Sequence, residues 1–291
     1  MTWKLSRPIK WITAASVLAV MLSAGCSAFD EQQSRWVFQP SAYSWNDGRG
    51  AAGVNDAWIG FKSEQTGSAI RLHALWMPQH VADAPLMLYL HGARWDVRSS
   101  ASRMRRMHDL GFAVLGIDYR GFGESSHEEP TEARAAEDAR QAWDWLGAHH
   151  PGVRRYVYGH SLGSAIAVRL AAEEPAAKQP AGLVLEGAFG SIPDLMATFR
   201  YGWLPLGPLV TQRFDAASRI ADLKMPVLML HGASDSLVPA ALGEALYERV
   251  KAPKRFLLIE GGSHHNASAL AQGEIRDAMT QLFGLSAGAS S

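Results

Sequence analysis

The chain has 291 residues, of which 47% are hydrophobic and 19% charged, so it is long enough to bury a core and is not a disordered protein. Its 28 Lys and Arg residues balance 28 Asp and Glu residues, which argues against a nucleic-acid-binding protein. The single cysteine excludes a disulfide framework, and the 11 histidines show no H-E-x-x-H spacing, so we expect neither a metal site nor a cofactor.

The first 25 residues have the pattern of a secretory signal peptide. Lys4, Arg7 and Lys10 precede an uncharged, largely apolar stretch over residues 11–25. A helix over that stretch would be about 22 Å long, shorter than the ~30 Å hydrocarbon core of a bilayer. The pattern therefore favours a cleaved signal over a membrane-spanning anchor.

The stretch ends in Leu22-Ser23-Ala24-Gly25-Cys26. This resembles the lipobox of bacterial lipoproteins, although the leucine lies one place further from the cysteine than in the commonest form. The resemblance implies that residues 1–25 are removed and that Cys26 becomes an acylated N-terminus. An ordinary cleavable signal that happens to contain Cys26 is the alternative. Ser27 resembles an outer-membrane sorting signal, so we expect a lipid-anchored protein of the bacterial cell envelope, in the outer membrane facing the periplasm.

After the signal, residues 26–53 are mixed and polar, and we interpret them as the lipidated N-terminus and a tether that begins to pack near Trp36. Residues 54–291 form one domain, because no repeat and no long Ser/Pro/Gly linker interrupts them.

Within this domain, short apolar runs alternate with amphipathic stretches of helix length. The runs expected to be strands are Leu86–Leu90, Phe112–Ile117, Tyr156–Tyr158, Leu183–Leu185, Val227–Leu230 and Phe256–Ile259. Several are continuously apolar, as expected when helices cover both faces of a sheet. Ile70–Trp76 alternates and is expected at an antiparallel edge, and Thr131–His149 is expected to be a crossover helix. The sequence therefore predicts an α/β fold with a doubly wound, mostly parallel sheet flanked by helices.

A G-x-S-x-G motif, Gly159-His160-Ser161-Leu162-Gly163, follows the Tyr156–Tyr158 run and precedes an alanine-rich helix pattern. This strand–turn–helix context is the one the motif requires. A tight turn holds Ser161 in a strained conformation and exposes its hydroxyl, while the two glycines allow close approach of backbone. The start of the helix brings the Leu162 N–H near Ser161, where it can donate to an oxyanion.

A serine nucleophile needs a base, and the base needs an orienting acid. Asp235 follows the Val227–Leu230 run, and His264 and His265 follow the Phe256–Ile259 run. The chain order serine, aspartate, histidine is the one found in α/β-hydrolases.

Two further motifs complete a resemblance to the α/β-hydrolase superfamily. They are Leu90-His91-Gly92-Ala93 and Asp118-Tyr119-Arg120-Gly121-Phe122-Gly123-Glu124-Ser125. With the three segments above, they resemble the small-cap branch related to acylglycerol lipases and serine aminopeptidases, over about residues 38–283. The resemblance implies that Ser161 is the nucleophile and that Asp235 orients the base. The usual G-x-x-H turn selects His264 as the base, whereas a variant with Asn directly after the histidine selects His265.

The resemblance also implies roles for neighbouring residues. A second oxyanion donor is expected from the N–H of Ala93, opposite that of Leu162. His91 and His231 are expected to bond loop backbone, and Asp118 and Glu124 to shape their loop. Glu186 lies where some relatives keep an alternative acid, although the context of Asp235 is better.

The family's cap corresponds here to a short segment at about residues 191–222, rich in apolar residues. It is interpreted either as an apolar wall for an acyl chain or as a short helical excursion that packs on the sheet. A short cap favours small or flexible esters. We therefore expect a serine hydrolase that cleaves small-molecule carboxylic esters through an acyl-enzyme. Thioesterase, peptidase and acyltransferase activities on the same residues are alternatives, as is a catalytically silent, membrane-tethered binding module.

Overall fold

The computed structural model describes residues 29–40, 53–81 and 83–285. The predicted signal peptide over residues 1–25 and the predicted lipidation site Cys26 lie outside the described residues, as do residues 41–52 of the predicted tether.

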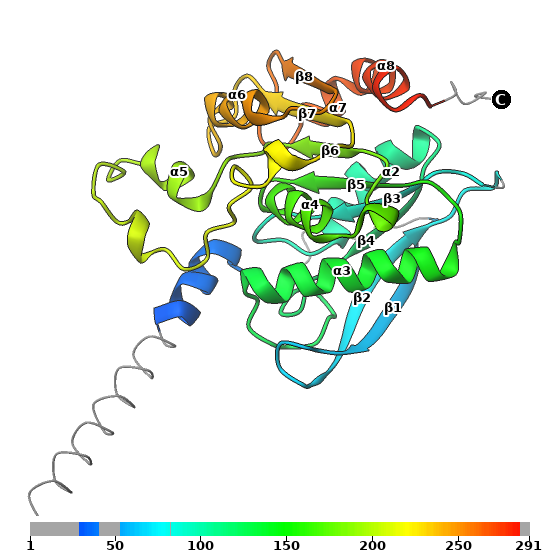
Figure 1. Ribbon diagram of the computed structural model, residues 1–291, viewed down its shortest axis with the longest axis horizontal. Coiled ribbons are helices and arrows are strands. Elements are labelled where there is room, and N and C mark those ends of the chain that lie inside the picture. Colours follow the sequence, from blue (N-terminus) through cyan, green and yellow to red (C-terminus); the bar gives the residue numbers. More distant parts are fainter. Residues whose placement is uncertain (1–28, 41–52, 82, 286–291) are drawn as a thin grey trace, which may run out of the picture.

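An eight-stranded sheet forms the centre of the molecule (Figure 1). Its strands are β1 (Asn55–Lys62), β2 (Ala69–Met77), β3 (Leu86–Leu90), β4 (Ala113–Ile117), β5 (Arg155–His160), β6 (Leu183–Glu186), β7 (Val227–Gly232) and β8 (Lys254–Ile259). They lie in the order β1-β2-β4-β3-β5-β6-β7-β8, and all neighbours from β4 to β8 are parallel. The predicted α/β fold and its mostly parallel sheet are confirmed, and each of the six predicted runs is a strand.

The edge of the sheet differs from the prediction. Ile70–Trp76 lies in β2, which is antiparallel to both its neighbours, but β1 pairs outside it and forms the edge. β1 has no apolar run because most of its side chains are exposed and Ile59 is its one fully buried member. An edge strand of this kind carries little of the hydrophobic pattern by which strands are recognised.

Helices cover both faces of the sheet (Figure 1). They are α2 (Ala101–Asp109), α3 (Glu132–His149), α4 (Leu162–Glu173), α6 (Ala240–Arg249), α7 (Ala267–Leu270) and α8 (Gln272–Phe283). A further helix, α5 (Ile192–Ala197), lies to one side of the sheet (Figure 1). Alternate residues of β3 belong to two separate buried clusters: Leu88 to one that includes residues of α3, α4 and α6, and Tyr89 to one that includes residues of α2, α7 and α8. This two-sided burial is what a continuously apolar strand requires.

Helix α3 follows the predicted pattern closely. The Thr131 side chain accepts a hydrogen bond from the Arg134 N–H at 3.2 Å and so caps the helix start. The predicted apolar face, Ala135, Ala139, Trp143 and Leu146, is fully buried.

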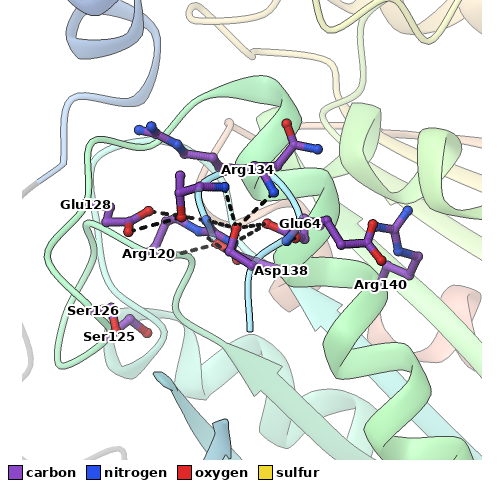
Figure 2. A network of polar contacts seen from close by, with 12 residues as sticks. Glu64, Arg120, Ser125, Ser126, Glu128, Arg134, Asp138 and Arg140 are labelled. Carbon is purple, nitrogen blue, oxygen red and sulfur yellow. Dashed lines mark hydrogen bonds and ion pairs between the residues drawn. The ribbon is translucent and has the colours of Figure 1, made fainter. Parts of the chain in front are cut away.

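A buried ion-pair network ties the loop after β4 to α3 (Figure 2). Arg120, fully buried, donates to Asp138 at 2.6 and 2.9 Å, to Glu137 at 2.7 Å and to Glu128 at 3.3 Å. Buried charges of this kind are stable only while each is paired. The network therefore fixes one end of the loop that contains Asp118 and Glu124.

The chain also forms a helix over residues 29–38, here called the N-terminal helix, which the sequence did not predict. Its Gln33 side chain donates to the Leu209 carbonyl and accepts from the Thr211 N–H, both at 2.9 Å. Phe38 is buried and packs edge-on against Phe214. The N-terminal helix is thus bonded to the segment at residues 191–222, which holds α5 and two short 3₁₀ turns, Gly207–Leu209 and Ile220–Asp222 (Figure 1).

Candidate active site

Ser161 lies in a strained turn between β5 and α4. Its φ of 55° and ψ of −121° are unfavourable for a residue with a side chain. The turn is held by a hydrogen bond from the Ser161 N–H to the Glu186 carbonyl at 2.8 Å. A Cβ on Gly163 would collide with the carbonyl oxygens of Leu90 and His91, so this position accepts only glycine.

His264 and Asp235 lie in the loops that follow β8 and β7, and the structure brings them into contact. His264 Nδ1 is 2.7 Å from Asp235 Oδ2. The other carboxylate oxygen accepts from the N–H groups of Leu237 at 2.9 Å and Val238 at 2.8 Å. Burial raises the pKa of Asp235, but the hydrogen bond and charge of His264 outweigh burial and lower it. An ionised Asp235 accepts a hydrogen bond from the Nδ1–H of His264, which leaves His264 Nε2 as the acceptor nitrogen.

His265 has different neighbours. Its ring contacts Trp95 at a centroid distance of 5.1 Å, and its side chain makes no hydrogen bond among the described residues. Burial, together with the charge of His264, lowers the pKa of His265. Of the two candidate bases, therefore, His264 alone contacts the candidate acid.

Ser161 and His264 both line one pocket of about 800 Å³. Their side chains are not hydrogen-bonded to each other in this structure. Gly187, with a φ of 61°, lies beneath the His264 ring, where a Cβ would approach the ring atoms to 3.0 Å. This contact, which requires a small residue directly after Glu186, was not predicted from the sequence.

The two predicted oxyanion donors lie near Ser161: Leu162 follows it directly, and Gly92, which precedes Ala93, is so close that a Cβ there would come within 3.0 Å of the Ser161 Cβ. Ala93 lines the pocket, and Leu162 is the first residue of α4. Neither backbone N–H has an acceptor within the described part of the chain. A pair of free N–H groups beside a nucleophile is the arrangement that stabilises an oxyanion.

The loop at residues 260–266, here called the histidine loop, contains His264 and His265. Next to it lies a buried ion pair between Arg103 of α2 and Glu186 of β6, at 2.9 Å. Arg103 also donates to the carbonyl oxygens of His264 at 3.1 Å and His265 at 2.9 Å. Burial would raise the pKa of Glu186, but the charge of Arg103 outweighs burial and lowers it. Tyr158 donates to the same carboxylate at 2.6 Å. Glu186 is thus engaged with Arg103 and makes no contact with His264 that would support the alternative acid.

His160, inside the motif, was not singled out from the sequence. Its Nε2 is 3.0 Å from the His264 carbonyl oxygen, and the side chain is buried. Burial, with the charge of Arg103, holds the pKa of His160 well below its usual range, so the ring is neutral and donates to that carbonyl. His160 and Arg103 together hold the backbone of His264 from two sides.

Other histidines and acids have structural partners. His231 Nε2 is 2.8 Å from the Val238 carbonyl, and His91 Nδ1 is 2.6 Å from the Gly92 carbonyl, so both bond loop backbone. Asp118 accepts from the Val97 N–H at 2.7 Å. In addition, Asp118 lies 3.0 Å from His73, whose other ring nitrogen is 2.8 Å from Asp56.

The pocket has one polar side and one apolar side. Ser161, Arg94, Arg103 and the histidine loop form the polar side. The apolar side comes from the N-terminal helix and the cap, and includes Phe29, Trp36, Leu195, Phe199, Leu206, Leu209 and Val210. Within the cap, Phe214 packs in the core, whereas Leu195, Phe199, Leu206 and Leu209 line the pocket.

In the described ranges, no group of three or more His, Cys, Asp or Glu side chains is arranged to hold a metal ion. Likewise, none of the helices at residues 29–40, 53–81 and 83–285 is long and apolar enough to cross a bilayer.

Comparison with known proteins agrees with the fold. Residues 83–214 match the family described as serine aminopeptidase, S33. An uncharacterized protein of Mycobacterium tuberculosis (strain CDC 1551 / Oshkosh) is 32% identical over 94% of each chain. Lysophosphatidylserine lipase ABHD12 of Xenopus tropicalis is 31% identical over 60% of this chain and 48% of its own length.

A solved esterase of Pyrococcus furiosus superposes with a TM-score of 0.65 at 18% identity, over 87% of this chain and 99% of its own. At that identity the likeness concerns the fold alone. Together with the match to the mycobacterial relative over 94% of each chain, it leads to one conclusion: the chain has the α/β-hydrolase fold and belongs to the same family as the uncharacterized mycobacterial protein.

Proposed function

We propose that this protein is a serine hydrolase that cleaves carboxylic esters. The observation that carries the proposal is the hydrogen bond between Asp235 and His264 beside a pocket that Ser161 also lines. The strained backbone of Ser161 supports it, because strain of this kind persists where the surrounding structure serves a function.

In the proposed reaction, His264 Nε2 takes the proton of Ser161 as the serine oxygen attacks the ester carbonyl carbon. The N–H groups of Leu162 and Ala93 donate to the oxyanion of the tetrahedral intermediate. The intermediate collapses, and the alcohol leaves with the proton from His264, so that the acyl group is bound to Ser161. A water molecule that gives a proton to His264 then attacks the acyl carbon, releases the acid and restores the serine.

We also propose that the acyl part of the ester is a hydrocarbon chain. A pocket of about 800 Å³ lies within the range of small-molecule sites, and its apolar side can receive a hydrocarbon chain. The name of the relatives called lysophosphatidylserine lipase supports lipid esters as the first substrates to assay.

The test is labelling of the folded protein with a fluorophosphonate, with the modified residue mapped by mass spectrometry. We expect the label on Ser161 and no label on the variants Ser161→Ala or His264→Ala. His265→Ala is the matched control and should still be labelled, because the His265 side chain has no carboxylate partner among the described residues. Loss of labelling in His265→Ala but not in His264→Ala would assign the base to His265 instead.

Turnover of esters, thioesters and peptides of matched acyl length then distinguishes an esterase from a thioesterase or a peptidase that uses the same residues. An added alcohol acceptor tests for acyltransferase activity. Faster turnover of a thioester or a peptide than of the matched ester would replace the ester proposal. Absence of labelling in a folded sample would favour the catalytically silent binding module.

We further propose the location that the N-terminal sequence predicts. Cys26 would carry the lipid and hold the protein in the bacterial outer membrane, facing the periplasm. Incorporation of a palmitate analogue into the wild-type protein, but not into Cys26→Ser, is the expected result. Equal incorporation into both proteins would contradict it.

A further inference from the structure

Exposed apolar side chains gather around the mouth of the pocket. Phe29, Trp36, Phe199, Leu206 and Leu209 line the pocket and are also exposed to solvent. They come from two segments far apart in the sequence, the N-terminal helix and the cap, which the hydrogen bonds of Gln33 hold together. These five side chains, here called the rim, thus line the pocket and are exposed at the same time, and an exposed group of large apolar side chains indicates an interaction.

The apolar surface continues beyond the rim. Tyr201, Trp203 and Leu204 lie in the same part of the cap and do not line the pocket, yet all three are exposed, Trp203 by 77%. These side chains contribute nothing to the core and do not enclose the ligand space. Their exposure therefore calls for a partner outside the molecule.

Charge indicates the kind of partner. Residues 195–213 contain two basic residues, Arg200 and Arg213, and no acidic residue. The Arg200 guanidinium lies 5.7 Å from the centre of the Tyr201 ring. Aromatic and aliphatic side chains mixed with arginine are typical of surfaces that bind the interface of an anionic bilayer. The N-terminal helix adds two acidic residues: Asp30, whose carboxylate accepts a hydrogen bond from Gln212 of the cap, and Glu31.

The course of the chain points the same way. Phe29 of the rim is three residues from Cys26, and three residues span at most about 11 Å. A lipid on Cys26 would hold the rim at the membrane surface, because the connecting segment is too short to place it elsewhere.

We propose that the rim, together with Tyr201, Trp203 and Leu204, docks onto an anionic lipid surface, so that an ester dissolved in the bilayer enters the pocket directly. The entry of substrate rests on the proposed hydrolase function, whereas the docking does not. An ester that reaches the pocket in this way avoids transfer of its acyl chain through water, which is costly for each methylene.

The first test measures the depth of Trp203 in the membrane. The full chain is bound to vesicles of brominated phosphatidylglycerol, and its tryptophan fluorescence is compared with that of Trp203→Phe, in which all other tryptophans remain. We expect wild type to be quenched more than the variant on this lipid, and the difference to be smaller on brominated phosphatidylcholine. Equal quenching of wild type and Trp203→Phe would overturn the docking, and equal differences on the two lipids would overturn the preference for anionic lipid.

The second test measures turnover. Trp203→Glu should reduce hydrolysis of a long-chain ester in phosphatidylglycerol vesicles by about tenfold or more. Hydrolysis of a water-soluble short-chain ester should stay within about twofold. Val81→Glu is the matched control, since Val81 is 71% exposed and lies in the β2–β3 loop, at the opposite end of the molecule from the cap (Figure 1).

The outcomes separate the two proposals. Quenching of Trp203 without turnover of either ester would refute the hydrolase proposal and leave the docking intact. An equal loss in Trp203→Glu and Val81→Glu would refute a specific role of the cap. If the protein is a dimer without vesicles and Trp203→Glu makes it monomeric in sedimentation, the surface binds a second copy, and the lipid proposal is wrong.

Discussion

Replacing Arg103 by methionine tests how the histidine loop is held in position. The Arg103 and Glu186 side chains are only 9% and 2% exposed, so the substitution leaves a carboxylate buried without its counter-ion. Breaking a buried pair in this way costs about 3–5 kcal/mol. The carbonyl oxygens of His264 and His265 also lose a donor, at about 1 kcal/mol each. We therefore expect Arg103→Met to lower the free energy of unfolding by roughly 5–7 kcal/mol.

The measurement is urea denaturation followed by far-UV circular dichroism. Arg276→Met, at an exposed position of α8, is the matched control and should change stability by no more than about 0.5 kcal/mol. The double variant Arg103→Met/Glu186→Gln removes the unpaired charge and should recover about half of the loss or more.

A second readout tests the position of the loop itself. In the folded double variant, fluorophosphonate labelling of Ser161 should be slower than in wild type, because His264 has lost a donor to its backbone. A loss below about 1 kcal/mol in Arg103→Met would refute the argument. So would a double variant no more stable than the single one.

Three further changes have expected outcomes. Arg120→Met should lower the free energy of unfolding, measured by urea denaturation, by about 3–5 kcal/mol. The loss should be larger at pH 8 than at pH 5, because burial raises the pKa of Asp138 to about 6 and the protonated acid needs no counter-ion. A loss independent of pH would contradict this. Burial lowers the pKa of His73, but hydrogen bonds to its two flanking carboxylates outweigh burial and raise it. Its stabilising contribution is therefore complete below its ordinary pKa of about 6.5 and is lost as pH rises through the folded value, so His73→Gln should cost more stability at pH 5.5 than at pH 9. The opposite trend would show that the neutral ring is the one stabilised. Gly163→Ala should give little soluble protein or no labelling of Ser161, because the added methyl group meets the Leu90 carbonyl, whereas Gly273→Ala, where a Cβ meets nothing, should behave as wild type.

The sequence predicted the parallel strands well because each contains a continuous apolar run, and β3, β4, β6 and β7 are buried along their whole length. Leu88 and Tyr89, which point to opposite sides of the sheet, are both apolar for that reason. β1 and the N-terminal helix escaped prediction because half or more of the residues in each are exposed. Their positions depend on pairing with β2 and on hydrogen bonds to the cap, and neither leaves a pattern in the local sequence.

The candidate site shows the same division. The motif around Ser161 and the aspartate and histidine after two later strands stand out in the sequence, and their catalytic roles stay predictions. Arg103 did not stand out, because it is one of three arginines in the segment Ser102-Arg103-Met104-Arg105-Arg106. Local sequence cannot tell which arginine of an amphipathic helix is buried. Only the packing of α2 against the histidine loop singles out Arg103.

The bond between the N-terminal helix and the cap has a consequence for synthesis. Gln33 and its partner Thr211 are 178 residues apart. At the usual 5–20 residues per second, roughly 10–35 s pass between the emergence of one and of the other. Throughout that interval the N-terminal helix lacks its native partner, and Phe38, which packs on Phe214 in the folded protein, is uncovered. One part of the pocket lining is thus synthesised early and its partner late. A chaperone that binds this helix in the interval would therefore influence how the pocket forms.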